Sequence, residues 1–393
     1  MSDSIIISSY ARTPMGGFQG ALSGVTSVQL GAVAVKAAVE RSGADASAID
    51  RIYMGCVLSA GLGQAPARQA ALGAGLPQSV EATTVNKMCG SGMQATIMAA
   101  EALAAGSADI IIAGGMESMT NAPYALPKHR SGARIGHDRV IDTMMMDGLE
   151  DAYDVGKPMG AFAEDTARDY QFTRAEMDAY AIESLNRARN AISSGAFKEE
   201  VVPVTVPGRG GDSVIVEDEQ PGNAKPEKIP GLRPAFAKDG AITAASSASI
   251  SDGAAALVIT RASIVEQFGL RQEARIVATA AHAHAPALFT TAPVFAIRKA
   301  LDKAGWSVED VDLFEVNEAF AAVAMIAMRD LAIPHAKVNV NGGATALGHP
   351  IGASGARIIA TLIAALKASG KTRGIAALCI GGGEATAIAL EIV

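Results

Sequence analysis

The sequence predicts an α/β fold built from two copies of one unit, and three observations support this prediction. A helix that ends in glycine precedes a β-rich run at residues 36–52 and again at 299–314. Further along, a Ser-Gly pair opens an Ala-rich helix that leads into a continuous apolar run, at 91–115 and at 354–383. Continuous apolar strands that alternate with helices are typical of sheets buried on both faces.

The repeat sets the expected domain boundaries. A shift of 262 positions pairs Gly43 with Gly305, the glycines that end the two first helices. The first half is expected to comprise residues 1–120 together with 245–271, and the second half residues 272–393. Chance alignment of Ala-rich helices explains either fragment alone, but two units in the same order favour a duplication.

Residues 121–244 have a different character and predict an inserted domain over the active-site face. This stretch is charged and rich in turns, for example at 203–211. One helix stands out within it. Thr173 followed by Glu176 forms a capping box, and the helical pattern runs on to Gly195.

Composition excludes several classes of protein. The 393 residues carry a net charge of −7, and 49% of them are hydrophobic while 19% are charged. No stretch approaches the roughly 18 continuous apolar residues of a membrane-spanning helix, and the N-terminus lacks the basic region of a signal peptide. The acidic balance argues against a nucleic-acid partner. We therefore expect a soluble protein with neither a membrane nor a nucleic-acid partner.

Three cysteines, Cys56, Cys89 and Cys379, predict free thiols in a reducing compartment, and hence a cytoplasmic protein. No cluster has the spacing of zinc ligands, so no metal site is predicted. His282 and His284 alternate on a strand and share one face, but two ligands without a third make a weak metal site. Cys56 is expected to pack or to line a pocket without a catalytic role.

Candidate catalytic residues lie where strands meet helices. Cys89 precedes a helix whose dipole favours a thiolate, although a buried core cysteine is the alternative. His349 lies in the corresponding loop of the second half and is placed for proton transfer, with a structural histidine as the alternative. Cys379 precedes three glycines whose N–H groups can bind an oxyanion. Asn317 follows a strand, at the edge where α/β sites gather.

Four ordered motifs resemble those of the thiolase family, and within it the acetyl-CoA acetyltransferase-like members. They are Val-Asn-Lys-Met-Cys-Gly-Ser-Gly at 85–92, Asn-Glu-Ala-Phe at 317–320, Gly-His-Pro-Ile-Gly-Ala-Ser-Gly at 348–355 and Cys-Ile-Gly-Gly-Gly at 379–383. The resemblance implies a thiolase fold, in which duplicated α/β halves form a five-layered αβαβα core. It also implies that the inserted loop domain serves coenzyme A (CoA) binding and oligomerisation, and that the chain forms a homotetramer.

The resemblance further implies a role for each catalytic residue. Cys89 would be the nucleophile that carries the acyl group, His349 would take its proton, and Cys379 would deprotonate the methyl group of acetyl-CoA. The enolate oxygen would be held by His349 and by a water on Asn317. A second oxyanion hole would use the backbone N–H groups of Cys89 and Gly381. No metal or cofactor is implied, because the CoA thioesters are substrates.

The resemblance also implies residues that contact the acyl and pantetheine groups, namely Leu149, Met159, Phe236, Ala248, Ser249, Phe289, Ala319 and Phe320. Several positions depart from the commonest family pattern. Pro158 replaces a histidine, Ala248 lies in a run that usually reads Asn-Ala-Ser-Gly, and Glu384 stands where Met or Gln is usual. Phe289 occupies a place near the acyl group that usually carries Met, so we expect it to narrow the pocket and favour acetyl and acetoacetyl groups.

The sequence therefore predicts an acyltransferase that interconverts two acetyl-CoA with acetoacetyl-CoA plus CoA through an acyl-Cys89 intermediate. A broader-range 3-ketoacyl-CoA thiolase is one alternative, and a noncatalytic acyl-CoA-binding homologue is another. Basic residues within 128–139, and Lys225 with Lys228, are candidates for contacts with the CoA phosphates. The first of these regions also corresponds to the tetramerisation loop of the family, so its role stays open.

Overall fold

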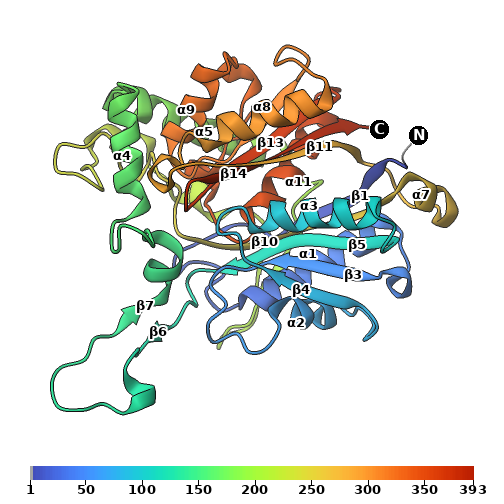
Figure 1. Cartoon of the computed structure of the whole chain (residues 1–393), viewed down its shortest axis with the longest axis horizontal. Helices are drawn as coiled ribbons and strands as arrows, with labels where there is room; N and C mark the ends of the chain where they lie inside the picture. Colours follow the sequence, from blue (N-terminus) through green and yellow to red (C-terminus); the bar gives the residue numbers. More distant parts are fainter. Residues whose placement is uncertain (1–2) are drawn as a thin grey trace.

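The computed structural model describes residues 3–393 and arranges them in five layers (Figure 1). Helices α1 and α2 cover one outer face, and α8 and α9 lie on the opposite one. Helices α3 and α11 pack together between the two β-layers. Met1 and Ser2, with which the expected first half begins, lie outside the described residues. The predicted αβαβα core is confirmed.

The first half contributes five main strands, in the order β4-β3-β5-β10-β1. Strands β4, β3 and β5 run parallel, whereas β10 is antiparallel to both β5 and β1. Its elements are β1 (Ile5–Arg12), β2 (Gly16–Gly17), α1 (Ser27–Ser42), β3 (Arg51–Gly55), α2 (Pro66–Gly73), β4 (Glu81–Val85), α3 (Ser91–Ala104), β5 (Ile110–Ser118), β10 (Ser251–Arg261) and α7 (Ala262–Phe268). Strand β10 thus returns to the first half after the inserted segment.

The second half repeats this pattern with four strands, in the order β11-β14-β13-β12. Strands β12 and β13 are parallel, and β14 is antiparallel to β13 and to β11. Its elements are β11 (Ala274–Ala283), α8 (Ala292–Ala304), β12 (Leu313–Val316), α9 (Ala321–Asp330), α10 (Ala344–Leu347), α11 (Ser354–Ala368), β13 (Arg373–Ile380) and β14 (Glu384–Ile392). A short antiparallel pairing of β1 with β11 joins the two halves into one hydrogen-bonded sheet.

Equivalent residues of the two halves make equivalent contacts. Helices α1 and α8 both end at a glycine in the left-handed conformation, Gly43 with φ 79° and Gly305 with φ 67°. Asp50 accepts backbone N–H bonds from the start of β5, at 2.7 and 3.1 Å. Asp312 accepts backbone N–H bonds at the start of β13, at 3.0 and 2.9 Å. These paired anchors support the duplication that the sequence predicts.

The first turns of α3 and α11 meet through a pair of glycines. A Cβ atom added to Gly92 would lie 2.9 Å from the backbone nitrogen of Ala356, and one added to Gly355 would lie 2.3 Å from that of Met93. The two helices can therefore approach this closely because neither glycine has a side chain. This contact brings the loop that precedes α3 next to the loop that precedes α11.

The inserted segment spreads over both halves. Its elements are β6 (Tyr124–Ala125), β7 (Ile141–Asp142), α4 (Met159–Asp169), α5 (Arg174–Ser194), β8 (Val204–Val206), β9 (Ser213–Ile215) and α6 (Glu219–Asn223). Helices α4 and α5 share an apolar cluster with the second half. The predicted capping box is present, because Thr173 accepts from the Glu176 N–H at 3.2 Å and Glu176 accepts from the Thr173 N–H at 2.7 Å. The boundaries at 120 and 245 stay a prediction.

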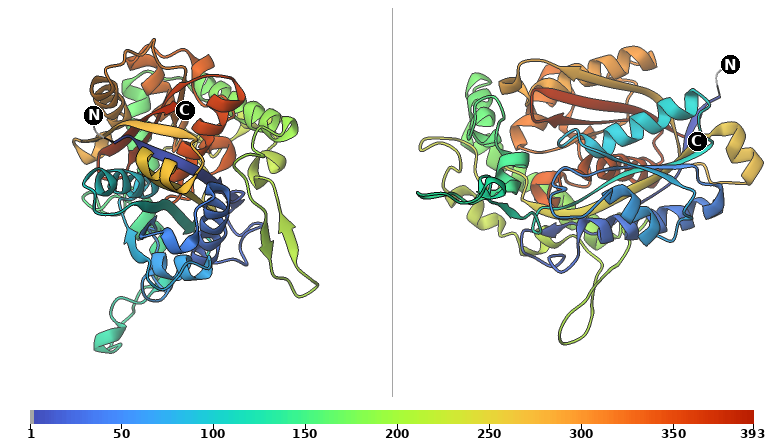
Figure 2. Two further views of the ribbon diagram at one scale, coloured as in Figure 1. Left: turned by 90° about the vertical axis from the view of Figure 1, so that its right-hand side faces the viewer. Right: turned by 60° about the horizontal axis from the view of Figure 1, so that its bottom comes forward.

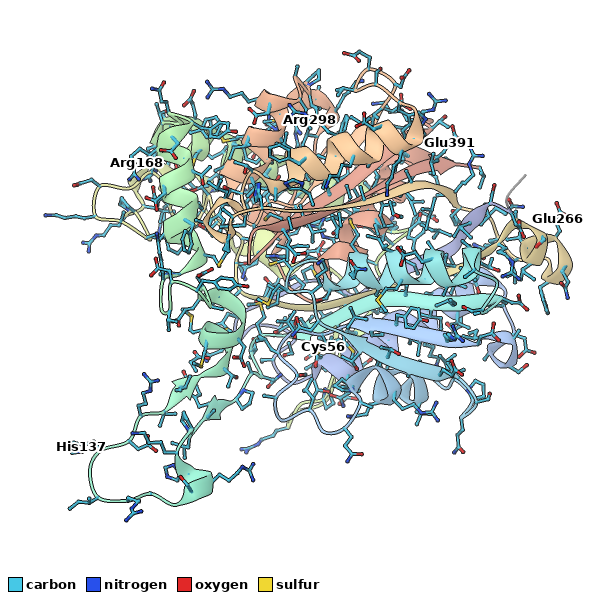
Figure 3. The ribbon with its side chains drawn as sticks, in the orientation of Figure 1. Cys56, His137, Arg168, Glu266, Arg298 and Glu391 are labelled. Atoms are coloured by element: carbon cyan, nitrogen blue, oxygen red, sulfur yellow. The ribbon has the colours of Figure 1, made fainter. Side chains whose placement is uncertain are left out.

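A buried ion network fastens the inserted segment to the first half. Arg12 on β1 donates to Glu200 at 2.8 Å and to both carboxylate oxygens of Asp218, at 2.7 and 2.9 Å. All three side chains are almost completely buried. The β8–β9 hairpin between these two acids extends away from the core in Figure 2. The β6–β7 hairpin also projects, with His137 at its tip (Figure 3).

Within residues 3–393, no helix combines the length and the apolar character that crossing a membrane requires.

Candidate active site

A small pocket forms where the two halves and the inserted segment meet. Its volume is about 80 Å³. Eleven of the predicted site residues line it: Cys89, Leu149, Met159, Ala248, Ser249, Phe289, Ala319, Phe320, His349, Cys379 and Gly381. Four residues that were not predicted also line it: Met119, Gly148, Ile250 and Ile351. Ile351 lies inside the quoted His349 motif and Ile250 directly follows Ser249, so sequence proximity alone points to these two.

A sharp turn between β4 and α3 presents Cys89. Met88 adopts a left-handed conformation with φ 46°, which is strained for a residue with a side chain. The Ser91 hydroxyl holds the turn, because it accepts from the Lys87 N–H at 2.9 Å and donates to the Met88 carbonyl at 2.6 Å. The strand, the strained turn and the helix together fix the sulfur at the wall of the pocket.

The resting form of Cys89 is the neutral thiol. Burial raises the pKa of Cys89 to about 11, although hydrogen bonds from the backbone N–H groups of Gly381 and of Cys89 itself act in the opposite direction. The expectation that the helix dipole favours the thiolate is therefore outweighed by desolvation. A base must remove the proton before the sulfur can attack a thioester.

His349 contributes an imidazole to the pocket. Burial, and then the nearby positive charge of Arg357, lower the pKa of His349 to about 3, so its imidazole is neutral. Its Nδ1 atom lies 2.6 Å from the Ser354 Oγ atom. Its Nε2 atom is buried and has no hydrogen-bond partner among residues 3–393. A neutral imidazole with one unpaired nitrogen can take up a proton from a substrate or from a neighbouring thiol.

Cys379 also lines the pocket, near the end of strand β13 and two residues before three consecutive glycines. Burial and the neighbouring Cys89 raise the pKa of the Cys379 thiol well above its usual range. Gly382 and Gly383 adopt left-handed conformations with φ 94° and 85°. The turn that they form directs the Gly381 N–H toward Cys89, where an oxyanion of a thioester can bind.

Asn317 stands directly behind the pocket and does not line it. Its Nδ2 atom lies 3.4 Å from Nδ1 of His349, and its Oδ1 atom accepts from Arg357 at 3.3 Å. Arg357 itself lies 3.7 Å from Glu315, and both side chains are buried. Burial raises the pKa of Glu315 to about 8. This contact between Arg357 and Glu315 was not predicted, because the two residues are far apart in the sequence and become neighbours only in the fold.

Phe236 also lies outside the small pocket. It packs edge to face against Phe320, with ring centroids 5.8 Å apart, and borders a separate groove of about 700 Å³. Pro158 is the residue before α4 and forms no side-chain cap. Glu384 forms an ion pair with Lys87, which ties the loop after Cys379 to the loop before Cys89. The departure from the family pattern at Glu384 therefore connects the turns that carry Cys89 and Cys379.

Glu117 joins the first half to the loop that carries His349. Its carboxylate accepts N–H bonds from Val57 at 3.0 Å, from Leu58 at 3.1 Å and from Gly352 at 2.9 Å. Burial raises the pKa of Glu117 to about 7. The Cys56 sulfur lies 3.7 Å from the same carboxylate and is buried outside the pocket, so the packing role predicted for Cys56 agrees with its position.

The remaining candidates do not form a metal site. His282 and His284 share one side of the strand as predicted, with ring centroids 4.9 Å apart, and His282 stacks on Phe295. No group of three Cys, His, Asp or Glu side chains suited to a metal ion occurs in the described part of the chain.

A second groove, of about 320 Å³, adjoins the small pocket. Ser249 borders both, and the groove is also lined by Lys225, Lys228 and Leu232. The groove thus borders the pocket that contains Cys89 at Ser249, and it is lined by two exposed lysines. The basic residues within 128–139 lie instead on the projecting β6–β7 hairpin (Figure 3).

Comparison with known proteins assigns the chain to a family. The model of the thiolase N-terminal domain matches residues 5–263, and that of the thiolase C-terminal domain matches residues 270–392. Acetyl-CoA acetyltransferases of Schizosaccharomyces pombe and Pseudomonas aeruginosa are 47% and 46% identical to this chain. Each comparison covers 99% of both chains.

Solved structures agree. The Acat5 thiolase of Ascaris suum in complex with coenzyme A superimposes with a TM-score of 0.94 and 43% identity, over 99% of this chain and 100% of that one. The Bacillus anthracis acetyl-CoA acetyltransferase superimposes with a TM-score of 0.97 and 40% identity, over 100% of this chain and 99% of that one. The fold and the family that the motifs predicted are confirmed: this chain belongs to the thiolase family.

Proposed function

We propose that this chain is an acetyl-CoA C-acetyltransferase, which interconverts two acetyl-CoA with acetoacetyl-CoA plus CoA. The observation that carries the proposal is the convergence of Cys89, His349 and Cys379 on one pocket of about 80 Å³. Two thiols and a neutral imidazole provide a nucleophile and separate bases, which Claisen chemistry needs. Full-length relatives named acetyl-CoA acetyltransferase support the same reading.

The first half-reaction transfers the acetyl group. His349 Nε2 takes the proton of Cys89, and the thiolate attacks the carbonyl carbon of acetyl-CoA. The N–H groups of Cys89 and Gly381 stabilise the oxyanion. When the carbon–sulfur bond to CoA breaks, the imidazolium returns its proton to the leaving CoA thiolate. The enzyme then carries an acetyl thioester on Cys89, and His349 is neutral again.

The second half-reaction forms the carbon–carbon bond. Cys379 first loses its proton to water and then, as a thiolate, removes a methyl proton from a second acetyl-CoA. The enolate oxygen is held by His349 and by a water on Asn317. The enolate carbon attacks the acetyl group on Cys89, the carbon–sulfur bond to Cys89 breaks and acetoacetyl-CoA forms. Cys379 then passes the methyl proton to the Cys89 thiolate. This scheme uses CoA thioesters as substrates and requires neither a metal nor another cofactor.

CoA binds in the groove that adjoins the pocket. Lys225 and Lys228 line this groove and supply positive charge for the phosphate groups, while Ser249 lies at its junction with the pocket. The apolar walls that surround Cys89 leave space for a short acyl group, with Phe289 on one side. The small volume favours this substrate over the longer ones of a broad-range 3-ketoacyl-CoA thiolase.

Replacement of Cys89 by alanine tests the assignment. We expect the Cys89→Ala variant to lose acetoacetyl-CoA thiolysis, because no sulfur is then available to form the acyl thioester. Cys56→Ala is the matched control, since Cys56 is buried outside the pocket, and it should retain the activity. An unchanged rate in Cys89→Ala rules out the nucleophile assignment. Absence of thiolysis in the wild type favours the noncatalytic acyl-CoA-binding homologue.

Assembly as a homotetramer in the cytoplasm belongs to the same proposal. The β6–β7 hairpin exposes four large apolar side chains, namely Tyr124, Leu126, Ile135 and Val140. A cluster of this kind is typical of a surface that binds another protein. A second copy of the chain is the partner that would cover them. The three free cysteines support a reducing compartment. Light scattering of the wild type and of Ile135→Lys would show whether the hairpin holds subunits together.

A further inference from the structure

The Nδ1 atom of His349 has two neighbours with opposite hydrogen-bonding capacities. Within residues 3–393, the Ser354 hydroxyl lies 2.6 Å away and the Asn317 Nδ2 atom lies 3.4 Å away. A hydroxyl can donate and accept, whereas an amide nitrogen can only donate. The other titratable or charged groups around this imidazole are Arg357 on α11 and the thiols Cys89 and Cys379 in the pocket.

The orientation of the Asn317 amide is fixed from behind. Arg357 Nη2 donates to Oδ1 of Asn317 at 3.3 Å, and this oxygen can only accept. The amide nitrogen therefore faces His349 as a donor. Hydrogen bonding to Asn317 suits only the tautomer in which Nδ1 carries a lone pair and Nε2 carries the proton.

The Ser354 hydroxyl suits the other tautomer. Ser354 is the first residue of α11, is completely buried, and donates to the Pro350 carbonyl at 3.0 Å. With its single proton engaged there, the oxygen accepts from an Nδ1–H group. The Nε2 atom of His349 then presents a lone pair to the pocket, where it has no other partner among the described residues.

We propose that Ser354 is the positioning residue that makes His349 a base, because its hydroxyl accepts the Nδ1–H bond that the base tautomer needs. This inference rests on the proposed function. In acyl transfer, the Cys89 proton moves to Nε2 while Nδ1–H stays bonded to Ser354, and the proton later leaves with CoA. In the enolate step, Nε2 must instead donate. The neutral imidazole therefore changes tautomer by exchange with solvent, losing the Nδ1 proton and gaining one at Nε2, and Nδ1 then accepts from Asn317 or from the rotated Ser354 hydroxyl.

The two half-reactions should therefore respond differently to loss of the hydroxyl. Ser354→Ala removes the one acceptor at Nδ1 found among the described residues, but it leaves the Asn317 donor in place. Loss of the hydrogen-bond partner that orients a metal-binding histidine typically costs about 10- to 100-fold in metal affinity or activity, and we take the same range for an imidazole that must be held as a base. We expect a decrease of this size in acyl transfer and a change of less than about threefold in enolate formation.

Each half-reaction has its own assay. Rapid mixing of the enzyme with acetyl-CoA gives the rate of CoA release, which reports acyl transfer. In a Cys89→Ala background acyl transfer is abolished, and the exchange of acetyl-CoA methyl protons with D₂O, followed by NMR, reports enolate formation by Cys379. Ser354→Ala is compared with its parent in both backgrounds.

Two further variants separate positioning from folding. Ser354→Thr and Ser354→Cys keep a group that can accept at Nδ1, and the better-folded of the two should recover part of the acyl-transfer rate. Thr361→Val is the control, since Thr361 is buried on the same helix but away from the pocket. It should leave the ratio of the two rates unchanged.

The outcomes distinguish this inference from the proposed function. A selective loss of acyl transfer in Ser354→Ala supports it. An equal decrease in both half-reactions, or an unchanged rate of acyl transfer, overturns it. Failure of the wild type to release CoA from acetyl-CoA would instead refute the proposed function itself.

Discussion

Replacement of Phe289 by alanine should widen the acyl pocket and extend the range of acyl chains that the enzyme accepts. Phe289 is 2% exposed, lines the pocket, and meets Phe320 at a ring-centroid distance of 6.2 Å. The pocket volume is about 80 Å³, whereas a cavity of about 150 Å³ admits benzene with its six carbon atoms. An acetyl group therefore fills the space that the wild type offers.

The size of the effect follows from the extra methylene groups. Thiolysis of 3-ketohexanoyl-CoA leaves a butyryl group on Cys89, which is two methylenes longer than acetyl. Each methylene that becomes buried contributes about 0.8 kcal/mol, so the two contribute about 1.6 kcal/mol. Since a tenfold change corresponds to about 1.4 kcal/mol, kcat/KM for the longer substrate, relative to acetoacetyl-CoA, should rise by up to about 15-fold.

The assay compares kcat/KM for thiolysis of both substrates in the wild type and the variant. Phe289→Ala removes a buried ring, which typically costs about 3–5 kcal/mol of stability, so Phe289→Leu is a milder second variant and thermal unfolding is recorded for both. Phe268→Ala, at an exposed ring on α7, is the control. Equal efficiency of the wild type on both substrates, or an unchanged ratio in folded Phe289 variants, would refute the reasoning.

Two further predictions concern the scaffold of the site. Gly355→Ala places a Cβ atom 2.3 Å from the Met93 backbone nitrogen, so urea unfolding should show a loss of about 1–3 kcal/mol. Gly210→Ala, with open space around it, is the control, and equal stability of the two variants contradicts the prediction. Arg357→Met removes a positive charge that helps to lower the pKa of His349 to about 3. The pKa of His349 should therefore rise. Since protonated His349 cannot act as a base, the acid limb of the pH profile of kcat/KM should move to higher pH. Arg357→Lys should move the limb less, and an unmoved limb in Arg357→Met excludes this electrostatic coupling.

Local features of the fold were predictable because their causes are local. The αL glycines that end α1 and α8, and the capping box at Thr173 and Glu176, follow from backbone and capping preferences within a few residues. The repeat of these features at a constant spacing then indicates the duplication. Four motifs located the two cysteines and His349 of the candidate site. The motifs at 85–92 and 317–320 lie where a strand is followed by a helix, and the motif at 379–383 lies in the turn between β13 and β14.

The electrostatics of the site were less predictable, because they depend on burial. A helix N-terminus alone favours a thiolate at Cys89, yet the folded chain surrounds this sulfur with apolar side chains and raises its pKa to about 11. The contact of Glu117 with Gly352 joins residues that are 235 positions apart. The position of Phe236, which packs against Phe320 and not in the small pocket, likewise depends on tertiary packing. None of these follows from a local pattern.

The duplicated scaffold explains why the chemistry is divided between the halves. At a shift of 263 positions, Ser91 at the start of α3 corresponds to Ser354 at the start of α11. The first serine holds the strained turn that presents Cys89, the proposed nucleophile, whereas the second contacts the imidazole of His349, the proposed base. The glycine contact between the two helices places both turns beside one pocket. In the proposed reaction, one structural position thus serves two different groups, because Ser91 supports the turn of Cys89 in the first half and Ser354 contacts His349 in the second.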